Sequence, residues 1–130
     1  MHDSEKETGE DDRPDVLVID DEWAAGETIA RFIQAHGYAA RVETNVFAGL
    51  HAVRRIQPAI VLLDIQMPGI DGIEAAELVI RYAPAARVIL MSGYPDQLSK
   101  AARDSLHAFA ILEKPLPLPA IVDFVRRSLG

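Results

Sequence analysis

The sequence predicts an α/β fold in which a parallel sheet is covered by helices on both faces. Five short apolar runs alternate along the chain with five segments in which apolar residues recur at helical spacing. Most of these runs are continuously apolar, as is typical of strands that are buried on both sides. Four of the runs end in an acid, a serine or a lysine, so we expect the polar side chains to meet at one edge of the sheet.

The five strand and helix pairs follow one another without interruption. The predicted strands are residues 16–19, 39–43, 60–63, 87–91 and 108–112. The predicted helices are residues 24–36, 46–56, 71–82, 95–106 and 118–129, separated by glycines and prolines. The helix over 95–106 is expected to be the weakest, because its apolar residues supply little bulk. Right-handed crossovers leave only a few doubly wound strand orders for such a chain.

Length and composition indicate one folded domain. Of the 130 residues, 15–130 are predicted to form this domain and 1–14 an acidic disordered tail. The absence of cysteine excludes disulfides, thiol nucleophiles and cysteine-ligated metals. Neither a signal peptide nor an apolar run of about 20 residues is present, so we expect no membrane contact and a cytoplasmic location.

The charge is concentrated at the N-terminus. Residues 1–15 hold seven acids and two bases, a net −5 of the formal −7, which leaves −2 for residues 16–130. A basic stripe is missing, and the acidic tail would repel a phosphate backbone. We therefore expect no direct binding of nucleic acid.

The polar residues at the predicted strand ends indicate phosphoryl chemistry. Asp20 and Asp21 follow the first strand, Asp64 the third, Ser92 the fourth and Lys114 the fifth. Three carboxylates at one edge would repel each other unless they protonate or bind a cation, and oxygen ligands favour Mg²⁺ or Mn²⁺. A metal, a lysine and a hydroxyl suit a phosphoryl group, and an aspartate can carry it as an acyl phosphate. Asp64 is the best candidate nucleophile.

The chain resembles the receiver domain of two-component response regulators, the CheY-like superfamily, over about residues 15–130. The resemblance is carried by Asp20-Asp21, by Leu-Asp-Ile-Gln-Met-Pro-Gly-Ile-Asp-Gly at 63–72, by Ser92-Gly93 and by Lys114-Pro115. Each motif is weak alone, but four in this order at successive strand ends are specific. The resemblance implies a flavodoxin-like (βα)5 fold with strand order 2-1-3-4-5.

The resemblance also implies how the phosphoryl group is accepted. Asp64 would receive it from the phosphohistidine of a histidine kinase or a histidine phosphotransfer protein. Mg²⁺, or Mn²⁺, would bind to Asp21, Asp64 and the backbone carbonyl of Gln66, and to Asp20 through water. The chain would thus be a phosphoacceptor that catalyses its own phosphorylation and dephosphorylation, and not an enzyme acting on metabolites.

Further roles implied by the resemblance concern the signal. Ser92 and Lys114 would hold the phosphoryl group, and the Lys114-Pro115 peptide bond would be cis. Ile111 stands where receivers usually carry the aromatic residue that reports phosphorylation, so Tyr94 or the loop after Ser92 is expected to take part in the switch. Gln66 and Tyr94 occupy the positions that tune the lifetime of the acyl phosphate, and their bulk favours a long lifetime.

The expected output is a protein-interaction face made by the fourth helix, fifth strand and fifth helix. It would bind an unidentified output protein or form a homodimer on phosphorylation. Because the sequence ends soon after the last predicted helix, we expect no output domain on this chain. It would be a stand-alone regulator, a phosphorelay shuttle, or a fragment of a larger regulator or hybrid kinase. Phe124 is predicted to lie off the apolar face of its helix, as an interface residue or an incidentally exposed one.

Other readings of the same residues are less favoured. A metal-dependent phosphohydrolase would need an acid two residues after Asp64, where Gln66 stands. A nucleotide or flavin binder would meet repulsion from the acids after the first strand, and a receiver-like module without phosphorylation would not need the full residue set. Taken singly, Asp20-Asp21 could cap the first helix, whereas Asp71 is interpreted as the N-cap of the helix over 71–82.

Overall fold

The computed structural model describes residues 15–105 and 107–129, so the predicted tail over 1–14 lies outside the described residues. All five predicted pairs are present, and their bounds differ from the predicted ones by two residues at most. The strands are β1 (Val16–Ile19), β2 (Ala40–Glu43), β3 (Ile60–Asp64), β4 (Arg87–Ser92) and β5 (Ala108–Glu113). The helices are α1 (Trp23–Ala35), α2 (Val46–Ile56), α3 (Gly72–Tyr82), α4 (Pro95–Asp104) and α5 (Leu118–Leu129).

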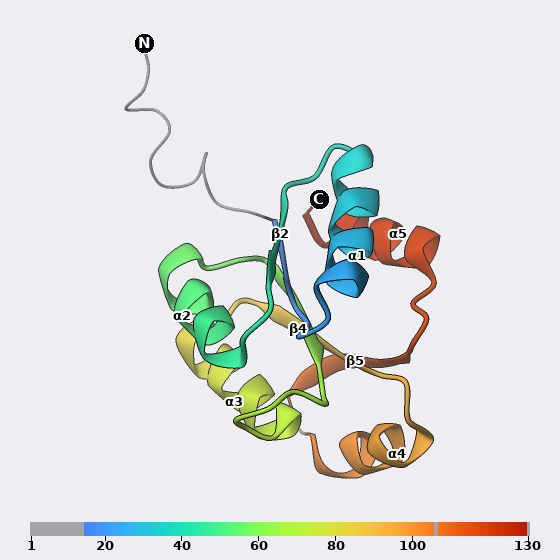
Figure 1. Ribbon diagram of the computed structural model, residues 1–130. Coiled ribbons are helices and arrows are strands. Elements are labelled where there is room, and N and C mark those ends of the chain that lie inside the picture. Colours follow the sequence, from blue (N-terminus) through green and yellow to red (C-terminus); the bar gives the residue numbers. More distant parts are fainter. Residues whose placement is uncertain (1–14, 106, 130) are drawn as a thin grey trace.

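The strands form one parallel sheet in the order β2-β1-β3-β4-β5, which confirms the predicted fold (Figure 1). The strand order reverses between β1 and β3, which lie side by side in the centre. In doubly wound sheets the carboxyl ends of the strands at this point form the usual ligand crevice. Asp20 and Asp64 both stand there.

Helices cover the two faces of the sheet unequally. Helices α1 and α5 lie together on one face, and α2 and α3 lie together on the other (Figure 1). The side chains of β1 and β3 alternate between two apolar cores, one under α1 and α5 and one under α2, α3 and α4. Their fully buried members in these strands are Val16, Val18, Ile60 and Leu62 on the first side, and Leu17, Ile19, Val61 and Leu63 on the second.

Helix α4 is held to the sheet by the fewest buried side chains. Ala101 is its single buried residue, whereas α2, which is one residue longer, buries six. This confirms the expectation of a weakly packed fourth helix. No helix in the described ranges is long and apolar enough to cross a bilayer.

An irregularity in β5 corrects one prediction. Val88 pairs with Ala108 but Ile89 pairs with Ala110, so Phe109 is an extra residue in the ladder, as in a β-bulge. The Phe109 ring lies 5.1 Å from that of Phe124 between centroids. Phe124 is therefore half-buried against its neighbour and not freely exposed, because the bulge places a second aromatic ring beside α5.

Candidate functional site

Three carboxylates gather at the carboxyl edge of the sheet. Ile19 pairs with Leu63, so the next residues of β1 and β3, Asp20 and Asp64, are neighbours. One oxygen from each of Asp20, Asp21 and Asp64 lies within 4.8 Å of the others. Asp20 is fully buried and Asp64 is 7% exposed, whereas Asp21 is exposed to solvent. Two buried acids need compensation of their charge.

Lys114 supplies this compensation from the end of β5. Its Nζ donates to Asp20 Oδ2 at 2.8 Å and to Asp64 Oδ2 at 3.1 Å. Its backbone N–H donates to the Ser92 carbonyl at 2.9 Å, which ties the end of β5 to that of β4. The Lys114–Pro115 peptide bond is cis, as expected. Residues 94 positions apart in the chain are thus joined in one ion-pair group.

Backbone N–H groups satisfy the other carboxylate oxygens. Asp20 Oδ1 accepts from the Glu22 N–H at 3.0 Å, and Asp64 Oδ1 accepts from the Gln66 N–H at 2.9 Å. The N-cap of α1 is Glu22, and its side chain makes no capping hydrogen bond. The reading of Asp20-Asp21 as a helix cap is therefore wrong, because the Asp20 carboxylate bonds ahead of the helix and faces Lys114. Asp71 does cap α3, accepting from the Ile73 N–H at 2.7 Å.

The ionisation of the site follows from burial and these contacts. Burial raises the pKa of Asp64 above its usual 3.8, and the Gln66 N–H and Lys114 only partly offset it. Burial acts to lower the pKa of Lys114, but hydrogen bonds and charges from Asp20 and Asp64 outweigh it, so the pKa lies above its usual 10.5. Lys114 is therefore a permanent cation at neutral pH.

A cavity of about 790 Å³ opens above the carboxylates. Its lining includes Asp21, Asp64 and Lys114, together with Gln66 and Tyr94 at the two predicted modulating positions. The Tyr94 side chain is 57% exposed. Asp64 can thus be reached from solvent although it is nearly buried.

The loop after Asp64 requires its glycines. Gly69 has a φ of 106°, in the region that favours glycine. A Cβ on Gly72 would lie 2.5 Å from the Ile65 Cα, so only glycine lets the start of α3 approach this loop so closely. The backbone conformation at Gly69 and the close approach at Gly72 account for the two glycines of this loop.

Ser92 is turned toward α4 and not toward the carboxylates. Ser92 is 1% exposed. Its Oγ donates a hydrogen bond to Gln97 Oε1 at 2.5 Å and accepts one from the Tyr94 N–H at 3.0 Å. Sequence reasoning missed Gln97. The available signal was its place in the first turn of α4, five residues after Ser92, but the sequence does not show which way the side chain points.

Ile111, at the expected switch position on β5, packs in the core, whereas Tyr94 lines the cavity beside Asp64. Ile111 is half-buried and packs against the core under α2, α3 and α4. Because the residue is an isoleucine, this position carries no aromatic ring that could rotate on phosphorylation. Trp23, at the start of α1, is 56% exposed two residues after Asp21. It is therefore a natural fluorescent reporter of events at the acid cluster.

The donor set fits a hard divalent cation. The cluster of Asp20, Asp21 and Asp64 offers only oxygen atoms, which suit Mg²⁺ or Mn²⁺ and not a softer metal. Asp21 is exposed to solvent and can therefore reach an incoming ion, whereas Lys114 contacts the two other acids.

The family described as the response regulator receiver domain matches residues 16–126. The chain belongs to this family. Transcriptional regulatory protein FixJ of Azorhizobium caulinodans is 38% identical over 116 residues, which are 88% of this chain and 54% of that protein. Sporulation initiation phosphotransferase F of Bacillus subtilis is 28% identical over 114 residues, 88% of this chain and 92% of that protein. The receiver domain thus spans about half of one relative and most of the other.

Solved structures show the same fold. A CheY-like receiver domain protein from Methanospirillum hungatei has a TM-score of 0.77 at 20% identity, over 90% of this chain and 94% of that one. A response regulator from Burkholderia pseudomallei, solved with a phosphorylated aspartic acid and a calcium ion, has a TM-score of 0.72 at 23% identity, over 88% of this chain and 72% of that one. The fold agrees with the family match, which makes this receiver domain a module of two-component signalling.

Proposed function

We propose that this receiver domain accepts a phosphoryl group on Asp64, in a Mg²⁺-dependent reaction, from the phosphohistidine of a histidine kinase or phosphotransfer protein. The observation that carries the proposal is the position of the Asp64 carboxylate. It lies 3.1 Å from Lys114 Nζ, beside two further acids, at the base of an accessible cavity. Family membership supports the same donor class.

The transfer is a displacement at phosphorus. An Asp64 carboxylate oxygen attacks the phosphorus in line, so a P–O bond forms while the P–N bond of the phosphohistidine breaks. The electron pair of the P–N bond stays on the imidazole nitrogen of the donor, and the product on this chain is an acyl phosphate. Water later attacks the phosphorus of this acyl phosphate; the P–O bond to Asp64 breaks, inorganic phosphate leaves and the carboxylate is restored.

Residues of this chain position and neutralise the transferred group. Lys114 already contacts Asp64 and can neutralise the negative charge of the phosphoryl oxygens after the transfer. The Ser92 hydroxyl can donate a hydrogen bond to one of these oxygens. Asp21, Asp64 and the Gln66 carbonyl would hold Mg²⁺, with Asp20 bound through water. When bound, this ion supplies positive charge that neutralises the phosphoryl oxygens. Gln66 and Tyr94 restrict water at the cavity and so lengthen the life of the acyl phosphate.

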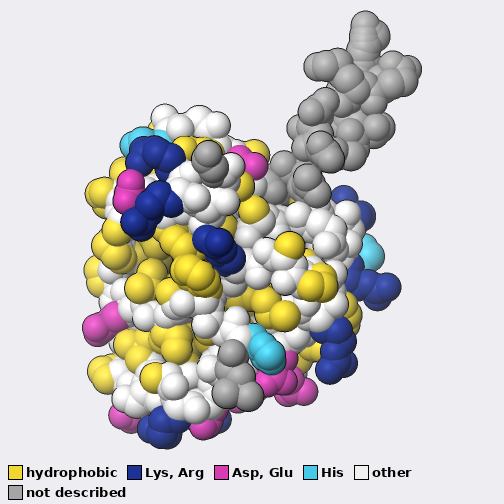
Figure 2. Space-filling model, turned by 180° about the vertical axis from the view of Figure 1, so that it is seen from behind, with side chains coloured by type: hydrophobic (Ala, Val, Ile, Leu, Met, Phe, Trp, Pro, Cys, Tyr) yellow, Lys and Arg dark blue, Asp and Glu magenta, His cyan; other side chains and the backbone are white. Residues whose placement is uncertain are grey.

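The proposed output surface is the face of α4, β5 and α5. Figure 2 shows hydrophobic side chains gathered on this side of the molecule, with Lys and Arg side chains beside them. Phe109 on β5 is 55% exposed, and the Arg87 guanidinium lies 4.9 Å from its ring centroid. Phosphorylation would shift a pre-existing equilibrium of this face, which then binds an output protein or a second copy of the chain.

The test is incubation with acetyl phosphate, with and without Mg²⁺, followed by intact-mass measurement. We expect one phosphoryl adduct on the wild type in the presence of Mg²⁺ and none on Asp64→Asn. Asp71→Asn is the matched control, because Asp71 is an acid at the end of the same loop whose side chain caps α3. We expect this variant to gain the same phosphoryl adduct as the wild type. An equal adduct on Asp64→Asn, or none on the wild type, would contradict the proposal.

A further inference from the structure

The Ser92 hydroxyl has one proton, and in this structure the proton is directed at Gln97. The hydrogen bond to Gln97 Oε1 is 2.5 Å long, and Ser92 is 1% exposed, so water does not compete for it. A hydroxyl can donate only one hydrogen bond at a time. If Ser92 is to donate to a phosphoryl oxygen on Asp64, its bond to Gln97 must break first.

Gln97 lies on α4, the helix with the fewest buried residues, so a single hydrogen bond contributes more to its position than it would in the other helices. Helix α4 buries Ala101 alone. An exposed ion pair between Lys100 and Asp71, with 3.7 Å between Nζ and Oδ2, also joins α4 to the loop between β3 and α3. Exposed pairs at this distance contribute little. The Ser92–Gln97 bond, at the buried end of β4, is therefore an important constraint on the first turn of α4.

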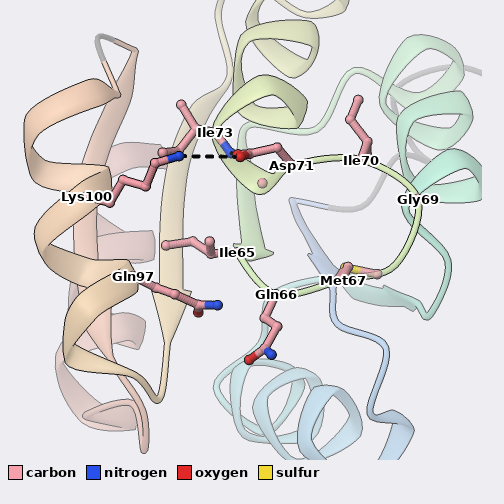
Figure 3. A pocket seen from close by; sticks show the side chains of 10 residues that line it. Ile65, Gln66, Met67, Gly69, Ile70, Asp71, Ile73, Gln97 and Lys100 are labelled. Atoms are coloured by element: carbon pink, nitrogen blue, oxygen red, sulfur yellow. Dashed lines mark hydrogen bonds and ion pairs between the residues drawn. The ribbon is translucent and has the colours of Figure 1, made fainter.

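Gln97 has space into which it can move when released. Figure 3 shows Gln97 and Lys100 directed from α4 toward the loop that carries Ile65, Gln66 and Asp71. Between the helix and this loop is an opening of about 500 Å³. The side chain can turn into this opening without displacing a packed neighbour, so loss of one bond can change the position of the helix end.

We propose that Gln97 is a positioning residue that holds the Ser92 hydroxyl away from Asp64 in the resting state, and that phosphorylation releases the first turn of α4 by taking this hydroxyl. The proposal rests on the proposed function and specifies its regulation. In most receivers an aromatic residue at the position of Ile111 couples phosphorylation to the output face. The proposal assigns this coupling to Gln97 on α4. The phosphoryl group on Asp64 and the Gln97 side chain then compete for the Ser92 hydroxyl.

The proposal predicts that removing the Gln97 acceptor favours the phosphorylated form. Gln97→Met keeps the length of the side chain but leaves the Ser92 hydroxyl without its acceptor in the resting state. We expect this variant to bind beryllofluoride with Mg²⁺, a mimic of the phosphoryl group, about three- to tenfold more tightly than the wild type. Trp23 fluorescence follows the titration. In a Ser92→Ala background, the same substitution should change the affinity by less than about twofold.

A second measurement reports the helix itself. The Gln97 and Leu98 N–H groups both bond to the Tyr94 carbonyl at 3.1 Å, so their exchange with deuterium reports the first turn of α4. We expect beryllofluoride to speed exchange there in the wild type, and Gln97→Met to exchange fast without it. Lys100→Met, which breaks the other link of α4, is the control and should not tighten beryllofluoride binding.

The outcomes separate the two proposals. A wild type that neither binds beryllofluoride nor gains a phosphoryl group from acetyl phosphate overturns the proposed function. A wild type that does both, with Gln97→Met unchanged in affinity, overturns the role of Gln97 alone. Tightening that persists in the Ser92→Ala background, or that Lys100→Met reproduces, also overturns it, because looseness of α4 would then explain the effect without Ser92.

Discussion

Two carboxylates, those of Asp20 and Asp64, are withdrawn from water while Lys114 Nζ contacts both, at 2.8 and 3.1 Å. If an apolar residue replaces the lysine, the two buried carboxylates lose their cation and repel each other in a site of low dielectric. We expect Lys114→Met to lower the free energy of unfolding by roughly 3 kcal/mol, measured by urea denaturation without metal.

Lys100→Met is the matched control for this substitution. The Lys100 and Asp71 side chains are both at least half exposed, so their pair should contribute less than about 1 kcal/mol. Mg²⁺ should restore part of the stability lost in Lys114→Met, because it also neutralises the acids. Equal losses in the two lysine variants would show that the buried acids do not depend on Lys114.

The raised pKa of Asp64 leads to a prediction about pH. Burial makes the ionised form less favourable in the folded chain than in the unfolded one. The destabilisation is fully present above the folded pKa and disappears as the pH falls toward the usual 3.8. Asp64→Asn should therefore have a higher Tm than the wild type at pH 7 without metal, and the difference should shrink in acid. A difference that grows as the pH falls would contradict the assignment.

At the scale of elements, the junction of the β3–α3 loop with α3 depends on a close backbone approach. A Cβ on Gly72 would meet the backbone of Ile65 at 2.5 Å from Cα and 2.7 Å from the carbonyl oxygen. We expect Gly72→Ala to cost about 1–3 kcal/mol of stability, because one backbone segment must shift. Since Gln66 follows Ile65 directly, the variant should also bind Mg²⁺ more weakly, as measured by Trp23 fluorescence.

Gly93→Ala provides the comparison for Gly72→Ala. Nothing lies within 4 Å of a Cβ at Gly93, although it follows Ser92 at the same edge of the sheet. Its stability should stay within about 0.5 kcal/mol of the wild type in a urea titration. If both alanine variants lost the same stability, the close approach at Gly72 would not be the cause.

At the scale of the whole molecule, metal binding and folding are linked. An ion that binds only the folded chain stabilises it by about 1.4 kcal/mol at ten times its dissociation constant. Mg²⁺ should therefore raise the Tm of the wild type and leave that of Asp21→Ala nearly unchanged. Asp21 is exposed, so its loss should hardly affect stability without metal. A full Mg²⁺ response in Asp21→Ala would exclude Asp21 as a ligand.

Much of this arrangement could be predicted from local patterns in the sequence. Continuous apolar runs such as Ile60–Leu63 indicate buried parallel strands, and acids directly after them are expected at the carboxyl edge of any such sheet. Asp20, Asp21, Asp64, Ser92 and Lys114 were all identified as strand-end residues in this way. The strand order and the cis bond at Pro115 came from the family resemblance.

The elements, their order and the residues at one edge of the sheet follow from the sequence alone, because hydrophobic periodicity and strand ends are local properties. The partners of these residues are known from the folded structure. Lys114 bridges Asp20 and Asp64, Ser92 donates to Gln97, and Phe109 pairs with Phe124 through a bulge. Each of these contacts depends on how separate segments pack and on the rotamer that the packing allows, which local pattern does not specify.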